Sequence, residues 1–162
     1  MLSALIYFAV IGVVFFIFGR VMPKDRIDPR AFPFRLYAFE KDGAVYRSLL
    51  VHRWQNHVPD MSRILPHMMP EKKLGTHFDL QTVQVLLAEN CTAELIHWLL
   101  CVAGLFCLKL CPGMGGVVLY ALYFLGNLPY IIIQRYNRPK LIRLQERLQQ
   151  REVRKGACVC VF

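Results

Sequence analysis

The segment PGMGG at residues 112–116 separates two long apolar runs. The run before it is ELIHWLLCVAGLFCLKLC (residues 94–111), and the run after it is GVVLYALYFLGNLPYIII (residues 116–133). Each run is about as long as a helix must be to cross the roughly 30 Å apolar core of a bilayer. Because one Pro and three Gly within five residues favour a tight turn, we predict that the two runs form a helical hairpin in a membrane.

A third uncharged run, MLSALIYFAVIGVVFFIFG, occupies residues 1–19. It lacks the basic start and the small-residue cleavage site of a signal peptide, so we expect a retained membrane anchor. The 162 residues are 56% hydrophobic, with a mean hydropathy of +0.36, which is too apolar for an ordinary soluble domain. We therefore predict a single all-α integral membrane domain with three transmembrane helices (1–19, 94–111 and 116–133) and no nucleic-acid partner.

The 20 Lys and Arg residues are unevenly distributed. Eleven lie within residues 20–73 and eight within residues 135–155, whereas only Lys109 lies beside the hairpin turn. In a three-span topology these two basic segments share one side, and the positive-inside rule makes that side cytoplasmic. We predict a multi-pass protein of the cell membrane with its N-terminus outside and its C-terminus in the cytoplasm.

The charged segments, residues 20–90 and 134–162, are predicted to lie at the cytoplasmic surface. Prolines soon after the first span favour an extended stretch there. Residues 44–58, AVYRSLLVHRWQNHV, mix aliphatic side chains with Arg and Trp, as interfacial amphipathic helices do. A further helix is expected from about Asp79, either continuing into the second span or breaking near Asn90. The tail is basic and has leucines at helical spacing, which predicts another surface helix.

Polar side chains gather near the cytoplasmic ends of the hairpin helices. Glu94 and His97 are three residues apart, so they share a helix face. An antiparallel hairpin brings Gln134 and Arg135 level with them, and Asn127 lies deeper on the same face as Gln134. Such groups cost on the order of 2 to 3 kcal/mol each in a membrane, so they are typically paired or functional.

Two interpretations of this cluster are open. An imidazole beside a carboxylate is the usual arrangement of a general base, which makes His97, oriented by Glu94, the candidate catalytic residue. Alternatively the residues only pack the helices, with Glu94 paired to Arg135 and Asn127 bonded to a neighbouring helix. The chain has no zinc, phosphate-loop or serine-hydrolase motif, so we expect neither a metal nor a bound cofactor.

Several segments resemble the glycosyl-4,4'-diaponeurosporenoate acyltransferase family, a group of small bacterial membrane proteins. The resemblance is carried by AELIHW (residues 93–98) and, about thirty residues later, NLPYIIIQRYNRPKL (residues 127–141). FEKDGAVY and VHRWQNHVPD are similar to the family's middle region, although Gln55 follows Trp54 where the family often has Lys. The resemblance covers roughly residues 19–145. It implies transfer of a fatty acyl chain to a sugar hydroxyl of a glycosylated carotenoid or another membrane glycolipid.

On this interpretation the co-substrate is a fatty acyl donor, such as a thioester. His97 takes the proton of the sugar hydroxyl, and Asn127, Gln134 or Arg135 stabilises the oxyanion that forms on the acyl carbonyl. We expect the guanidinium groups of Arg53, Arg135 and Arg138 to bind phosphates of the donor. Trp54 and Asp60 are expected to position the acceptor sugar. The predicted substrate-binding set is Arg53, Trp54, Asp60, Tyr136, Asn137 and Arg138.

Two other functions remain open. Another small lipid-modifying enzyme, such as a membrane methyltransferase, would use the same face but bind S-adenosylmethionine. A non-enzymatic membrane subunit would use its polar residues for packing alone. Membrane lipids are expected partners in each case. Three spans are few for enclosing two lipid substrates, which leaves room for a homo-oligomer or a partner enzyme.

Overall fold

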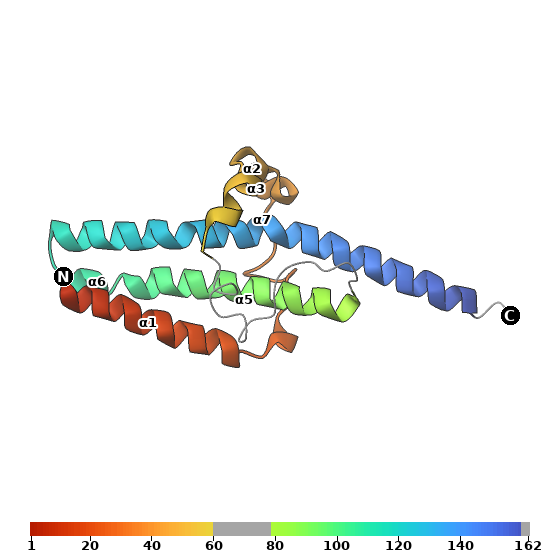
Figure 1. Cartoon of the computed structure of the whole chain (residues 1–162), viewed down its shortest axis with the longest axis horizontal. Helices are drawn as coiled ribbons and strands as arrows, with labels where there is room; N and C mark the ends of the chain where they lie inside the picture. Colours follow the sequence, from red (N-terminus) through yellow and green to blue (C-terminus); the bar gives the residue numbers. More distant parts are fainter. Residues whose placement is uncertain (60–78, 160–162) are drawn as a thin grey trace.

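The computed structural model describes residues 1–59 and 79–159, and for Lys41, Asp42 and residues 155–159 it describes the backbone alone. Those ranges contain helices and turns but no strand, which confirms the all-α class. Three helices are long and apolar enough to cross a membrane: α1 (Leu2–Val21), α5 (Leu80–Gly104, followed by the short α6, Cys107–Leu110) and α7 (Met114–Val159). They lie side by side, with the N-terminus beside the turn between α6 and α7 (Figure 1).

The predicted hairpin is formed by α5 and α7, and its turn depends on glycine. Gly113 has a φ of +92°, a conformation that glycine adopts readily because it lacks a Cβ. Gly116, in the first turn of α7, lies so close to the backbone of Cys111 that a Cβ there would overlap the carbonyl oxygen. Glycine is therefore required at both positions for different reasons, one conformational and one steric.

Helix α5 begins well before the predicted span and passes through Asn90 without a break. Asp79 caps it, because the carboxylate accepts a hydrogen bond of 3.0 Å from the backbone N–H of Thr82, as is preferred at a helix N-terminus. The predicted helix start near Asp79 is thus confirmed. The first half of α5 extends beyond the predicted span of 94–111.

Helix α7 is one continuous helix of 46 residues, about 69 Å long and therefore more than twice the thickness of an apolar bilayer core. The tail continues the third span in nearly the same direction (Figure 1), so it is not the separate surface helix that we predicted. Pro129 and Pro139 lie inside α7. Each removes one backbone hydrogen bond, but neither ends the helix, because these turns are packed against α5 and the preceding chain.

Helix α1 runs antiparallel to α5. Near its start the Tyr7 hydroxyl donates to the backbone carbonyl of Ala103 at 2.8 Å, and near its end Gly19 packs against Ile96 and Thr92. The end of α1 therefore lies at the end of the bundle where α7 becomes basic. Within the described residues, the two basic segments thus share one end, as predicted. The side of the membrane that this end faces stays a prediction.

Residues 22–59, here called the strap, cross from the end of α1 over α5 to α7 (Figure 1). Its elements are short: η1 (Lys24–Arg26), η2 (Ala38–Gly43), α2 (Ala44–Ser48), α3 (Val51–Trp54) and η3 (Gln55–His57). The prediction of one helix over residues 44–58 is wrong. Leu50 has a φ of +53°, and this left-handed conformation interrupts a right-handed helix. Whether the strap lies on the membrane surface stays a prediction.

We expect Gly116→Ala to destabilise the protein, because the new methyl group would overlap the backbone of Cys111. Overpacking of this kind typically costs about 1 to 3 kcal/mol. The measurement is the thermal unfolding midpoint of the detergent-solubilised protein. Gly115→Ala is the matched control, since nothing lies within 4 Å of a Cβ at that position. Equal midpoints for the two variants would contradict this account of the turn.

Candidate active site

Four charged side chains are buried together at the end of the hairpin away from its turn. They are Glu40, Glu94, Arg135 and Arg138, and their exposed fractions are 0, 2, 9 and 0%. Arg135 lies about 30 Å along α7 from the first residue of that helix, which is about the thickness of the apolar core of a bilayer. The four residues, here called the ion cluster, therefore lie about one core thickness along the helices from the hairpin turn.

Arg135, on α7, binds both α5 and the strap. Its Nε donates to Glu94 Oε1 on α5 at 2.7 Å. Its Nη1 donates to both carboxylate oxygens of Glu40 in the strap, at 2.8 and 2.9 Å. Its Nη2 donates to the backbone carbonyl of Pro33 at 3.3 Å, and the ring of Tyr37 lies 5.1 Å from the guanidinium carbon. A planar guanidinium suits such forked contacts, which a lysine could not make.

Arg138 makes a second set of contacts one turn further along α7. Its Nη2 donates to the other oxygen of Glu94, and its Nη1 donates to the backbone carbonyl of Phe34 at 2.6 Å. Its Nε donates to Asn90 Oδ1 at 3.1 Å, and the Asn90 amide donates in turn to Gln134 Oε1 at 2.7 Å. Two carboxylates and two guanidinium groups balance in charge, as buried ions require.

Glu40 is held in its charged form. Burial raises the pKa of its carboxyl group, but hydrogen bonds from the Tyr46 hydroxyl and the Tyr37 backbone, together with Arg135, outweigh this effect. The pKa of Glu40 therefore lies below its ordinary value. Burial, and then the neighbouring Glu40 carboxylate, raise the pKa of Tyr46, so this hydroxyl stays protonated and acts as a donor.

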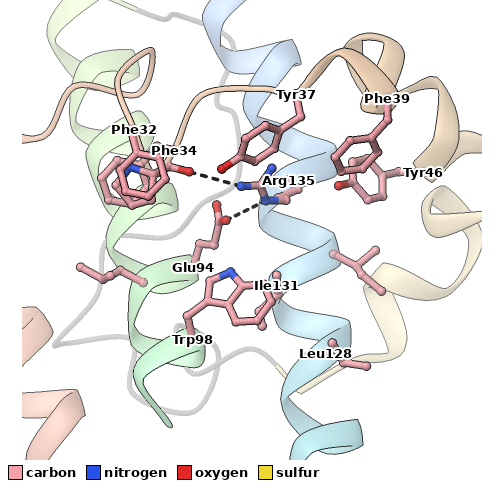
Figure 2. A pocket seen from close by; sticks show the side chains of 13 residues that line it. Phe32, Phe34, Tyr37, Phe39, Tyr46, Glu94, Trp98, Leu128, Ile131 and Arg135 are labelled. Carbon is pink, nitrogen blue, oxygen red and sulfur yellow. Dashed lines mark hydrogen bonds and ion pairs between the residues drawn. The ribbon is translucent and has the colours of Figure 1, made fainter. Parts of the chain in front are cut away.

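A cavity of about 470 Å³ lies between the strap, α5 and α7, within the size range of ligand pockets. Glu94 and Arg135 form its charged end, whereas the other side chains around it are mainly aromatic and aliphatic (Figure 2). The full lining is Phe32, Pro33, Phe34, Tyr37, Phe39, Tyr46, Glu94, Leu95, Trp98, Leu128, Ile131, Ile132 and Arg135.

His97 belongs to a different part of the helix pair. Its Nδ1 lies 2.8 Å from Asn127 Oδ1, and the Asn127 amide group donates to the backbone carbonyl of Tyr123 at 2.9 Å. That second bond points Oδ1 at the imidazole, and because an amide oxygen only accepts, Nδ1 donates to it. The ring of Tyr130 stacks on the imidazole at 4.5 Å.

The structure thus divides the predicted constellation in two. Glu94 and Arg135 line the cavity, but His97 is absent from its described lining. Glu94 bonds both arginines, whereas the partner of the imidazole is Asn127. That Glu94 also orients His97, with which it shares a helix face, stays a prediction. Glu94–Arg135 pairing is the contact that the packing interpretation predicted.

The predicted substrate-binding residues also separate. Arg138 is fully buried with protein partners, so it presents no guanidinium to a donor phosphate, which corrects that prediction. Tyr136 is buried in a cluster with Tyr46 and Val51, against which Trp54 packs. Tyr46 lines the cavity, but Tyr136 and Trp54 are absent from its described lining. Of the remaining candidates, Arg53 is exposed, Asn137 is half-buried, and Asp60 lies outside the described residues.

Two residues of the site were missed by sequence reasoning. Glu40 lies in FEKDGAVY, where its charged neighbours made it resemble a solvated surface residue. Asn90 was considered only as a possible helix break, although an amide inside an apolar helix is itself a signal of pairing. The Q-R-Y-N-R-P box at residues 134–139 was recognised, but the strap residues that bind its two arginines were not.

The fold and the site define a multi-pass membrane protein with a cavity of ligand size beside a buried ion cluster. The glycosyl-4,4'-diaponeurosporenoate acyltransferase family matches residues 29–147, which is well over half of the chain. The chain belongs to this family and is an acyltransferase.

Curated relatives carry the same name. The chain is 26% identical over 122 residues to glycosyl-4,4'-diaponeurosporenoate acyltransferase of Staphylococcus haemolyticus (strain JCSC1435), covering 75% of this chain and 70% of the relative. It is 25% identical over 134 residues to the enzyme of that name from Staphylococcus aureus (strain MRSA252), covering 82% and 80%. No solved structure matches the chain.

We expect Glu40→Gln to lower the thermal unfolding midpoint at pH 7, because it removes one of the two carboxylates that pair with the buried Arg135 guanidinium. Breaking a buried ion pair on one side costs about 3 to 5 kcal/mol. A carboxyl group with a depressed pKa stabilises the fold above its ordinary pKa and loses that contribution as the pH falls through its folded value. The difference in unfolding midpoint between Glu40→Gln and the wild type should therefore shrink below about pH 4.5.

Glu146→Gln is the matched control for this pH series. Glu146 pairs with Arg30 at 2.7 Å, but both side chains are about half exposed, and exposed pairs contribute little. We expect its midpoint to follow that of the wild type throughout. A Glu40→Gln difference that stays constant from pH 7 to pH 3.5 would rule out the charged form of Glu40 as its cause.

Proposed function

We propose that this acyltransferase moves a fatty acyl chain from an activated donor, such as a thioester, to a sugar hydroxyl of a membrane glycolipid at the cytoplasmic face. The names of the relatives give a glycosyl-4,4'-diaponeurosporenoate as their acceptor. We propose an acceptor of the same chemical class for this chain, a glycosylated carotenoid.

The observation that carries this proposal is the cavity beside the ion cluster. Its walls are apolar, and it borders Glu94 and Arg135 where the helices leave the apolar core (Figure 2). An amphiphile with a long chain and a polar head matches this distribution of polarity. Packing of the helices explains the ion pairs, but it does not explain a cavity of about 470 Å³ beside them.

We propose His97 as the general base. Its lone pair on Nε2 takes the proton of the sugar hydroxyl while the hydroxyl oxygen attacks the acyl carbonyl carbon. The bond from the carbonyl to the donor sulfur then breaks, and the imidazolium returns the proton to the leaving thiolate. Asn127 acts as a positioning residue, because its amide oxygen holds the required tautomer. Asn127 is therefore not assigned to the oxyanion in this mechanism.

Arg135 is the group proposed to stabilise the oxyanion or the donor head, because it lines the cavity, as Arg138 does not, while keeping its pairs with Glu94 and Glu40. A general base has to reach the hydroxyl that attacks the acyl carbonyl. The proposal therefore requires the carbonyl to lie where the cavity approaches His97, and the roles of His97 and of the cavity can be tested with separate variants.

The alternatives make different predictions. A methyltransferase would require S-adenosylmethionine and would add the mass of a methyl group to its lipid product. A non-enzymatic subunit would leave the lipids unchanged. Membership of an acyltransferase family favours acyl transfer over both.

We expect lipid mass spectrometry of cells that express the protein to show a glycolipid heavier by one fatty acyl unit. His97→Gln should reduce this product by about 10²- to 10⁴-fold, the usual contribution of a general base, while inserting normally. His52→Gln is the matched control, because His52 is an exposed residue of the strap. A wild-type level of product with His97→Gln would remove His97 from the mechanism, and the absence of an acylated lipid with the wild type would overturn the proposed function.

A further inference from the structure

The cavity has a direction along α7. Leu128 and Arg135 are seven residues apart, so they share a face of this helix, and about 10 Å of helix axis separates them. On α5, Trp98 lies one turn from Glu94 in the same sense. Figure 2 shows Trp98 on α5 and Leu128 on α7, both on the side of Arg135 opposite to Tyr37. On that side of the charged residues the described lining is apolar.

The apolar end lies deeper in the membrane than the charged end. Residues 116–133 form the apolar part of α7, and Leu128 is inside this part whereas Arg135 is just beyond it. A bound amphiphile therefore has its head at Arg135 and its chain directed towards Leu128. The end of the chain meets the side chains of Leu128 and Trp98.

The cavity also has a mouth that faces outward. Phe32 and Phe39 both line it, yet 76% of Phe32 and 67% of Phe39 is exposed. Exposed large aromatic side chains suit contact with lipid, so we place the entry of the acyl chain beside them.

We infer that Leu128 and Trp98 determine the length of the acyl chain that the enzyme transfers, because they line the deep part of the cavity. This inference rests on the proposed function and assigns the cavity to the acyl chain of the donor. In an apolar pocket, one methylene too many or too few changes selectivity by about 10-fold or more. A change in side-chain volume at this end should therefore shift the distribution of transferred chains.

The test uses membranes that contain the full chain, an alkyl glucoside as acceptor and an equimolar mixture of saturated fatty acyl-coenzyme A thioesters of graded length. The readout is the distribution of acyl chains on the glucoside by mass spectrometry. We expect Leu128→Ala to shift it to longer chains and Leu128→Trp to shift it to shorter ones, with ratios of neighbouring lengths changed by about 10-fold. Leu125→Ala is the matched control, because Leu125 is an exposed residue of α7 that does not line the cavity.

Each outcome decides the inference. Opposite shifts for the two Leu128 variants, with the distribution of Leu125→Ala unchanged, support it. Unchanged distributions for all three variants overturn it while leaving the proposed function intact, as does a shift caused by Leu125→Ala. The proposed function itself is overturned if two results are both negative: the wild-type protein forms no acylated glucoside, and cells that express it make no acylated glycolipid.

A second measurement needs no variant, so it decides the inference even where the Leu128 variants give no product. The wild-type protein is irradiated with a fatty acyl thioester that carries a photoreactive group at the end of its chain, and the labelled peptide is identified. Labelling within the α5 and α7 turns that contain Trp98 and Leu128 supports the inference. Labelling confined to the exposed faces of α1 or of the tail overturns it.

Discussion

The buried ion pairs of Arg135 are the contacts on which the rest of this structure depends. One guanidinium binds Glu94 on α5 and Glu40 in the strap, so it joins segments that are far apart in the chain. Such ions are expensive to bury, and they remain charged only because each has a partner and a full set of hydrogen bonds. The strap contributes both a carboxylate and two backbone carbonyls, from Pro33 and Phe34. It therefore cannot be shifted without leaving a charge unpaired.

This constraint also creates the site. Because Glu40 and the two carbonyls fix the strap over α5 and α7, aromatic residues of the strap line one cavity together with side chains of both helices. Glu94 and Arg135 of the ion cluster are the charged residues of that lining. The same buried ion pairs thus order the strap and give the cavity its polarity.

The sequence predicted the elements whose signals are local. The apolar runs, the PGMGG turn and the start of α5 near Asp79 follow from length, glycine content and capping. The level of Glu94 and Arg135 follows from counting residues along an antiparallel hairpin. The strap could not be predicted in the same way, because its conformation is determined by contacts with residues about 100 positions away. Nothing local in FEKDGAVY shows that Glu40 is buried, and nothing near Leu50 requires a positive φ. The bonds between Glu94 and Arg138 and between Glu40 and Arg135 could not be predicted from local sequence for the same reason, since strap residues bind both arginines.

The most direct test of the central claim is a double-mutant cycle between Glu40 and Arg135, measured as unfolding free energy in detergent. Glu40→Gln and Arg135→Gln each unbalance the cluster by one charge, whereas the double variant restores neutrality. We predict that the double variant is less destabilised than the sum of the single variants, with a coupling energy of about 1 to 3 kcal/mol. Additive effects, with a coupling energy below about 0.5 kcal/mol, would contradict the claim that this ion pair holds the strap to the membrane helices.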